Sequence, residues 1–323
     1  MNADNRRLLR LQVKEMNKKR SSARRVVLFM FLSLVVSHST AQLQDPAPQS
    51  TDFEVGRRPE AMVFDGSNVW VANQQSDSLM KLRASDGLNM GTFETGTRPV
   101  ALAYDGTHVW VANQMSNNVM KFLAKDGSLV ATVTVGQQPQ GLTFDGKDVW
   151  VANGGDNTVT KLRLSDGASC TYVVGKRPMG IVYDGENIWV VNNDSSSVTK
   201  LRGTDGVKLG TYRVGKSPVG ITFDGTNIWV TNFYGNSVTQ LRASDGQVLN
   251  TIAVADGPFG IAFVNGYVWV ANYGNSSVAQ IETKRGAVVN TFKVGKSPTG
   301  VVFDGTNIWI SNGGSNSVSR LSL

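Results

Sequence analysis

The 323-residue chain is poor in cysteine and histidine, with one and two of them, and its apolar run at residues 26–36 is short. The single cysteine, Cys170, excludes an intramolecular disulfide, so the fold must be stabilised by other means. A membrane-spanning helix needs about 20 apolar residues, more than this run provides. The scarcity of histidine also limits catalysis, because histidine is the usual acid–base group near neutral pH.

The net charge of +7 belongs to one end of the chain. Residues 1–25 contain nine basic and two acidic residues, whereas the remaining residues contain 23 of each kind. A basic stretch, an apolar run and then Ser39-Thr40-Ala41 are typical of a secretory signal peptide. We expect residues 1–41 to be this signal, either cleaved or retained as an anchor. The sequence thus predicts a periplasmic, secreted or cell-surface protein that has no membrane span after cleavage, and its neutral remainder argues against nucleic acid as a partner.

A repeat fills the rest of the chain. All seven tryptophans recur at spacings of 39 or 40 residues, and a proline precedes each of them by 11 residues. These tryptophans are Trp70, Trp110, Trp150, Trp189, Trp229, Trp269 and Trp309. A fixed period of this length is typical of propeller blades. Four short β-rich runs in each unit, separated by turns such as Asp-Gly, predict four antiparallel strands per blade.

The two ends of the array complement each other. The last unit stops after its third strand, at residues 317–321, and residues 51–56 align with the fourth strand of the preceding unit at residues 290–295. We therefore predict an all-β, seven-bladed β-propeller over residues 51–323, closed by its N-terminal strand. Residues 42–50 would form a linker, and we expect the propeller to be a monomer.

The repeat resembles known propeller families. Its second strand reads WVAN, WVTN, WVVN or WISN, close to the Y-V-T-N motif of YVTN-type β-propeller repeats in exported and surface proteins. The pattern P-x-G-I-x-F-D-G-x-x-I-W also resembles the repeats of streptogramin (virginiamycin B) lyases and, more distantly, NHL-type propellers. The resemblance covers residues 51–323. It implies a fold far more specifically than a function, because propellers have many functions.

The resemblance to the lyases would imply catalytic histidines and a glutamate on the top face of the propeller. Here His38 lies in the signal, and His108 lies in a hairpin at the other end, so these residues do not carry over. Metal-dependent lactonase propellers hold an ion near the axis. Here Glu60 is the one carboxylate at the axial variable position, which provides few of the oxygen ligands that calcium needs. Cys170 has no histidine nearby in sequence, which favours a buried or idle thiol. We predict no catalytic residue, no metal site and no cofactor.

Comparison of the seven repeats separates structural positions from candidate sites. Asparagines end all seven second strands, and aspartates recur in the first hairpins of six units. We interpret both as turn residues, with a polar ligand ring as the alternative for the asparagines. The tryptophans are interpreted as packing between blades. The hairpins from strand 1 to 2 and from strand 3 to 4 share a uniform end, and the other connections share a variable end.

The variable end has a scattered basic rim, one axial carboxylate and aromatic residues from blades five and six. The candidate ligand-binding residues are Arg57, Arg58, Glu60, Arg98, Lys176, Arg177, Phe233, Tyr234, Phe259 and Tyr273. Aromatic residues beside polar groups suit sugar or peptide ligands, although exposed loops also vary by drift. We interpret the protein as a non-catalytic binding or scaffold module for a protein, peptide or glycan of the cell envelope. A lyase- or lactonase-like enzyme that uses Glu60 is the alternative.

Overall fold

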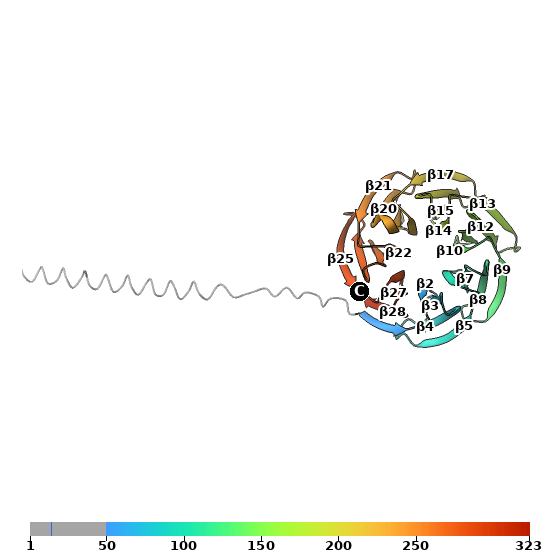
Figure 1. The fold of residues 1–323 in the computed structure, drawn as a ribbon, viewed down its shortest axis with the longest axis horizontal. Helices are drawn as coiled ribbons and strands as arrows, with labels where there is room; N and C mark the ends of the chain where they lie inside the picture. The colour runs from blue at the N-terminus through green and yellow to red at the C-terminus, as the bar shows by residue number, and fades with distance from the viewer. Residues whose placement is uncertain (1–13, 15–49) are drawn as a thin grey trace, which may run out of the picture. The chain divides into compact units, whose positions relative to one another are not determined.

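Short alternating segments between Asp-Gly turns form strands of five to seven residues. The computed structural model describes residue 14 and residues 50–323. Seven four-stranded antiparallel sheets surround a central axis (Figure 1). The predicted seven-bladed β-propeller is therefore confirmed. The predicted signal peptide (apart from residue 14) and all but the last residue of the predicted linker lie outside the described residues.

Each blade is a meander of strands that follow one another in the chain. Blades one and two contain β2 (Pro59–Phe64), β3 (Asn68–Asn73), β4 (Ser78–Arg83), β5 (Asn89–Glu94), β6 (Pro99–Tyr104), β7 (His108–Asn113), β8 (Asn118–Leu123) and β9 (Leu129–Thr134). Blades three and four contain β10 (Pro139–Phe144), β11 (Asp148–Asn153), β12 (Thr158–Arg163), β13 (Ser169–Val173), β14 (Pro178–Tyr183), β15 (Asn187–Asn192), β16 (Ser197–Arg202) and β17 (Lys208–Arg213).

Blade five contains the one short 3-10 helix within residues 50–323, η1 (Phe233–Gly235), between its second and third strands. Blades five and six contain β18 (Pro218–Phe223), β19 (Asn227–Asn232), β20 (Ser237–Arg242), β21 (Val248–Ala253), β22 (Pro258–Val264), β23 (Tyr267–Asn272), β24 (Ser277–Glu282) and β25 (Ala287–Lys293). Blade seven contains β26 (Pro298–Phe303), β27 (Asn307–Asn312), β28 (Ser317–Ser322) and β1 (Ser50–Glu54).

The N-terminal strand closes the ring, as predicted. β1 pairs antiparallel with β28, from Ser50 opposite Leu321 to Glu54 opposite Ser317. In Figure 1 the blue β1 lies beside the red strands of the last blade. The ring of Phe53 stacks on Trp309 with the centroids 5.4 Å apart. Because β1 covers the edge of β28, the third strand of blade seven is not left open.

The tryptophans fill the interfaces between blades. All seven indoles are at most 3% exposed. Trp70 packs against Val109 and Val111 of the next blade. Trp309 packs against Val69 in the same way, which continues the interface across the closure of the ring. The interpretation of the tryptophans as packing between blades is confirmed.

The hairpin aspartates accept hydrogen bonds from these indoles as well as from the backbone of their own turns. In six blades the aspartate accepts a hydrogen bond from the indole Nε1 at 2.6–2.8 Å. The Oδ1 atom of Asp224 also accepts from the backbone N–H groups of Thr226 and Asn227. The turn role is confirmed, but the bond to the indole is an addition that the sequence did not reveal. Blade six has Val264 at this position, and the buried Nε1 of Trp269 has no partner among the described residues.

The asparagines that end the second strands are fully buried, which excludes a ligand ring. Their Nδ2 atoms donate to a side chain at the start of the third strand, as from Asn232 to Ser237 Oγ at 3.1 Å. In blade four Asn192 also accepts from the backbone N–H of Gly175, at 2.9 Å. The structural interpretation is therefore correct, but most of the partners found are side chains and not the backbone. A Cβ atom on Gly215 would lie 2.5 Å from Asn232 Cγ, so this close approach requires glycine.

Lysines tie neighbouring blades together in part of the ring. Lys81 Nζ lies 5.0 Å from the centroid of Trp70 and donates to the carbonyl of Ala124 in the next blade at 2.7 Å. Lys161 and Lys200 make the same two kinds of contact in blades three and four. Each of these cations thus stabilises an indole face and an interface between blades.

We predict that Asp224→Ala lowers the free energy of unfolding by about 1 to 3 kcal/mol, because it leaves the indole N–H of Trp229 buried without an acceptor. Denaturant titration measures this loss. Asp245→Ala is the matched control, because this exposed carboxylate pairs with Arg242 at the surface and should contribute much less to stability. Equal losses in the two variants would contradict the proposed role of the indole bond.

We predict that deletion of residues 42–56 lowers the melting temperature by roughly 10 °C or more, because β28 loses its partner and Phe53 its packing. Deletion of residues 42–49 alone serves as the control and should leave the melting temperature unchanged. Differential scanning calorimetry and sedimentation report stability and aggregation. Full solubility and an unaltered melting temperature in the longer deletion would refute closure by β1.

Candidate functional site

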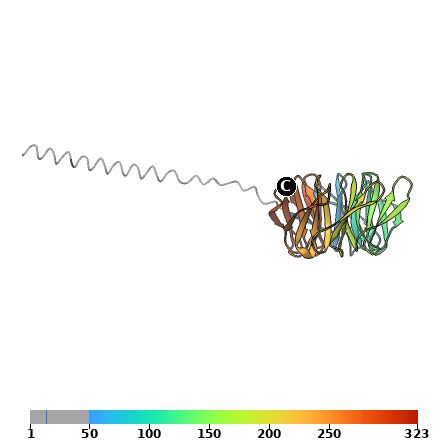
Figure 2. The same cartoon turned by 90° about the horizontal axis from the view of Figure 1, so that it is seen from above.

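The connections between strands lie at two ends of the propeller, as predicted. Figure 2 shows the strands running between these two ends, with loops at both. His108 begins β7 at the hairpin end, where its Nδ1 lies 3.3 Å from Asp105 Oδ2. Cys170 lies on β13 in the outermost position of blade three and is exposed, so of the two expectations, a buried or an idle thiol, the first is wrong and the second stays a prediction. Neither residue is at the variable end.

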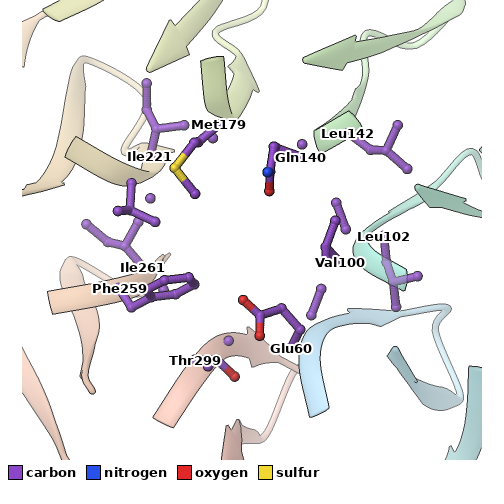
Figure 3. Close-up of a pocket in the computed structure, with 18 of the residues that line it drawn as sticks. Glu60, Val100, Leu102, Gln140, Leu142, Met179, Ile221, Phe259, Ile261 and Thr299 are labelled. Atoms are coloured by element: carbon purple, nitrogen blue, oxygen red, sulfur yellow. The ribbon is translucent and has the colours of Figure 1, made fainter. Parts of the chain in front are cut away.

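A cavity of about 220 Å³ lies on the axis, lined by the first strands of all seven blades (Figure 3). We define its mouth by the residues that follow the prolines, namely Glu60, Val100, Gln140, Met179, Val219, Phe259 and Thr299. Aliphatic side chains such as Leu102 and Ile221 line it further along the strands. A Cβ on Gly141 would lie 2.1 Å from the carbonyl oxygen of Met179, which confirms that small residues are needed where the first strands crowd the axis.

Glu60 is the one charged side chain that lines this cavity. Figure 3 shows its carboxyl group directed into the open space. The Oε2 atom is enclosed and has no hydrogen-bond partner among the described residues. Desolvation by burial raises the pKa of Glu60 to about 7, although the positive charges of Arg58 and Arg98 act in the opposite direction. The carboxyl group therefore exchanges its proton near neutral pH, which is frequent at functional sites.

Three of the predicted basic residues lie together. Arg57, Arg58 and Arg98 line a second hollow of about 540 Å³, and the charges of Arg58 and Arg98 reach Glu60. The Nη2 atom of Arg57 donates to the carbonyl of Gln75 at 3.1 Å. Asp77, which also lines this hollow, accepts from the backbone N–H of Arg98 at 2.8 Å. This arginine hollow combines positive charge with polar groups at the variable end.

The other two predicted basic residues stand apart. Lys176 and Arg177 belong to the connection into blade four and line neither the axial cavity nor the arginine hollow. Arg177 Nη1 lies 3.9 Å from Asp194 Oδ1, and both side chains are more than half exposed. Such a surface pair contributes little binding or stability. The structure thus divides the basic rim into an arginine hollow and a separate exposed pair.

The four predicted aromatic residues form one cluster, which we call the aromatic sector. The ring of Phe233 lies 5.1 Å from Tyr234, 6.1 Å from Phe259 and 6.1 Å from Tyr273, measured between centroids. Phe259 also lines the axial cavity, whereas Tyr234 is 70% exposed. The aromatic sector therefore runs from the cavity mouth outwards across blades six and five.

Two glutamines at the variable end were not singled out from the sequence. Gln74 and Gln114 directly follow the asparagines of blades one and two, and each has an enclosed Oε1 atom without a hydrogen-bond partner among residues 50–323. Gln74 is 4% exposed and lines the arginine hollow. The other five blades carry Gly154, Asn193, Phe233, Tyr273 or Gly313 here. This variation was the available signal, because it breaks an otherwise regular repeat.

The side chains at the mouth offer several kinds of contact. Glu60 can accept or donate one hydrogen bond, the arginines can bind an anion or a ring oxygen, and the aromatic sector can stack on an apolar face. Within the described residues, no group of three or more histidine, cysteine or acidic side chains is arranged to hold a metal ion.

The chain matches no protein-family model and no curated protein. Among solved structures it is similar to a streptogramin B lyase, with 21% identity, a TM-score of 0.74 and coverage of 85% of this chain and 97% of that one. Virginiamycin B lyase from Staphylococcus aureus matches with 19% identity, a TM-score of 0.74 and coverage of 85% and 99%. Hydrazine synthase of Kuenenia stuttgartiensis matches with 20% identity, a TM-score of 0.73 and coverage of 82% and 96%. These likenesses confirm the expected lyase-like propeller fold, and at this identity they show the fold alone.

We predict that Glu60→Gln stabilises the protein at pH 8 but not at pH 4. The folded-state pKa is about 7 and the ordinary value is 4.5, so ionisation of Glu60 destabilises the fold above pH 7, and this cost vanishes below pH 4.5. The variant should gain on the order of 1 to 3 kcal/mol at pH 8. Urea titrations at the two pH values test this, with the exposed Glu94→Gln as control. A gain that is equal at both pH values would contradict the burial of an ionisable Glu60.

Proposed function

We propose that the protein is an exported binding module that holds a ligand at the variable end of the propeller, over the mouth of the axial cavity. The proposal rests on one observation. The aromatic sector reaches the cavity mouth through Phe259, and Glu60 lines the same mouth. Four aromatic rings from two blades form one continuous cluster, and one of them lies largely in solvent. Such exposed aromatic groups are enriched where proteins bind other molecules.

The residue types at the mouth support a non-catalytic role. Proton transfer in a lyase requires a positioned acid or base close to the reacting group. Glu60 titrates near the right pH, but its enclosed oxygen is not oriented by a hydrogen bond from any described residue. His108 is held in a hairpin at the opposite end. These features favour a binding site that uses Glu60 for recognition over an enzyme of the lyase or lactonase type.

The sequence pattern supports a location for the protein, and therefore for its partner. The basic and apolar stretch of residues 1–36, followed by small residues up to Ala41, supports export. No helix in the described part of the chain is long and apolar enough to cross a membrane. From the export pattern in the sequence, we propose a protein, peptide or glycan of the cell envelope as the class of partner. Lys176 and Arg177 would at most guide a charged partner towards the mouth.

We predict that replacing Phe233, Tyr234, Phe259 and Tyr273 with alanine weakens capture of the partner at least tenfold, because the stacking surface is lost. The wild-type chain and the variant would be immobilised and exposed to envelope extract, and the retained material would be quantified. The matched control replaces Tyr104 and Tyr183, whose hydroxyl groups donate to hairpin carbonyls at the opposite end. Undiminished capture by a folded quadruple variant would refute the proposed site.

A further inference from the structure

Glu60, whose Oε2 atom has no donor among the described residues, and the aromatic ring of Phe259 both line the axial cavity. We propose that the ligand is a glycan whose terminal sugar ring enters the mouth, donates hydroxyl groups to Glu60 and Gln74 and stacks an apolar face on Phe259. This inference rests on the proposed function and names the chemical class that the same site binds. Figure 3 shows Glu60 and Phe259 both directed into the cavity from different blades.

The first observation is a shortage of donors. Glu60 Oε2, Gln74 Oε1 and Gln114 Oε1 are enclosed, and none has a hydrogen-bond partner among the described residues. All three are oxygen atoms on adjacent blades, one and two. Six of the strand-end asparagines also have an Oδ1 atom that is unpaired within residues 50–323, but they are fully buried and line neither the axial cavity nor the arginine hollow. Glu60 and Gln74 differ from them because Glu60 lines the axial cavity and Gln74 the arginine hollow, where a ligand could supply the missing donor. A ligand with several hydroxyl groups at the mouth would offer donors to Glu60 and to Gln74.

The repeat places Gln74 beside Glu60. Gly154 is the equivalent of Gln74 in blade three, and a Cβ built on it would lie 2.9 Å from Cγ of Gln140, which occupies the position of Glu60 in that blade. The side chain at this repeat position therefore starts towards the mouth residue of its own blade. Gln74 also lines the hollow that contains Arg58 and Arg98, whose charges act on Glu60. The two acceptors thus belong to one polar side of the mouth.

The second observation is the geometry of the aromatic sector. The rings of Phe259 and Tyr273 have centroids 6.3 Å apart and planes inclined by 37°. Phe233 lies nearly edge-on to Phe259, at 85°. A pyranose has both an apolar face, which stacks on an aromatic ring, and hydroxyl groups around its edge, which can donate to acceptors beside that ring. This pairing of surfaces matches the two sides of the mouth.

The charge around the mouth disfavours other ligands. Arg57, Arg58 and Arg98 outnumber the acidic groups Glu60 and Asp77 around the arginine hollow, which would repel a cationic peptide or amine. An extended peptide offers one backbone N–H per residue, so it places few donors in so small a space. The walls further along the axis are apolar, which limits entry to the end of the glycan chain. A neutral or acidic sugar terminus therefore fits best.

The test uses the full-length protein and isothermal titration calorimetry with three defined probes: cellotetraose, a tetramer of N-acetylglucosamine and a tetramer of galacturonic acid. We expect at least one probe to bind. Gln74→Leu should weaken this binding about tenfold without lowering the melting temperature, because Oε1 of Gln74 has no protein partner to lose. Glu60→Gln and Phe259→Leu should each weaken it several-fold. Gln247→Leu, in an exposed hairpin turn, is the matched control and should change nothing.

A phage-displayed library of random heptapeptides forms the comparison arm. Peptides that bind and that depend on the aromatic sector, with no binding of any sugar probe, would overturn the glycan inference and leave the proposed function standing. Sugar binding that is insensitive to Gln74→Leu, Glu60→Gln and Phe259→Leu would overturn the assignment to the mouth. If neither sugars nor peptides bind, both the inference and the proposed function are wrong.

Discussion

The packing of an indole between each pair of neighbouring blades is the interaction on which the whole ring depends. A four-stranded sheet of this size cannot bury its faces alone, and in a repeat protein each unit is stabilised by its neighbours. Trp70 against Val109 shows how this works along the chain, and Trp309 against Val69 shows it at the closure. The indole N–H would be costly to bury alone, and the hairpin aspartate satisfies it in six blades.

The same structural demands, repeated in every blade, leave limited room for variation. The aspartates, tryptophans and asparagines recur because each satisfies a packing or hydrogen-bonding need. The clearest departures gather in blades five and six. There, Gln240 and Gln280 accept from Asn250 and Asn290 at the position where earlier blades have lysine, and Val264 replaces the aspartate. These two blades also supply the aromatic sector, so the least regular part of the ring carries the surface that we assign to binding.

Unlike the repeated residues, which stabilise the fold, Glu60 lowers its stability. Desolvation by burial raises the pKa of the Glu60 carboxyl group to about 7, so its ionised form opposes folding. Replacing it with an apolar residue, as in the same position of blades two and five, would remove this cost. Polar groups that weaken the fold in this way are concentrated at functional sites. This cost distinguishes Glu60 from the other residues at the mouth, none of which carries a charge.

The sequence by itself determined the number of blades, the strand order, the closure by residues 51–56 and the variable end. Such inferences succeed because turn chemistry and strand alternation are local and were repeated seven times. Only the tertiary structure showed that the charges of Arg58 and Arg98 lower the pKa of Glu60, and that Lys176 lies outside the arginine hollow. It alone revealed the bonds from aspartate to indole and the acceptors that lack donors. Burial and hydrogen-bond satisfaction depend on which atoms of different blades are in contact. The order of residues along the chain does not by itself specify those contacts.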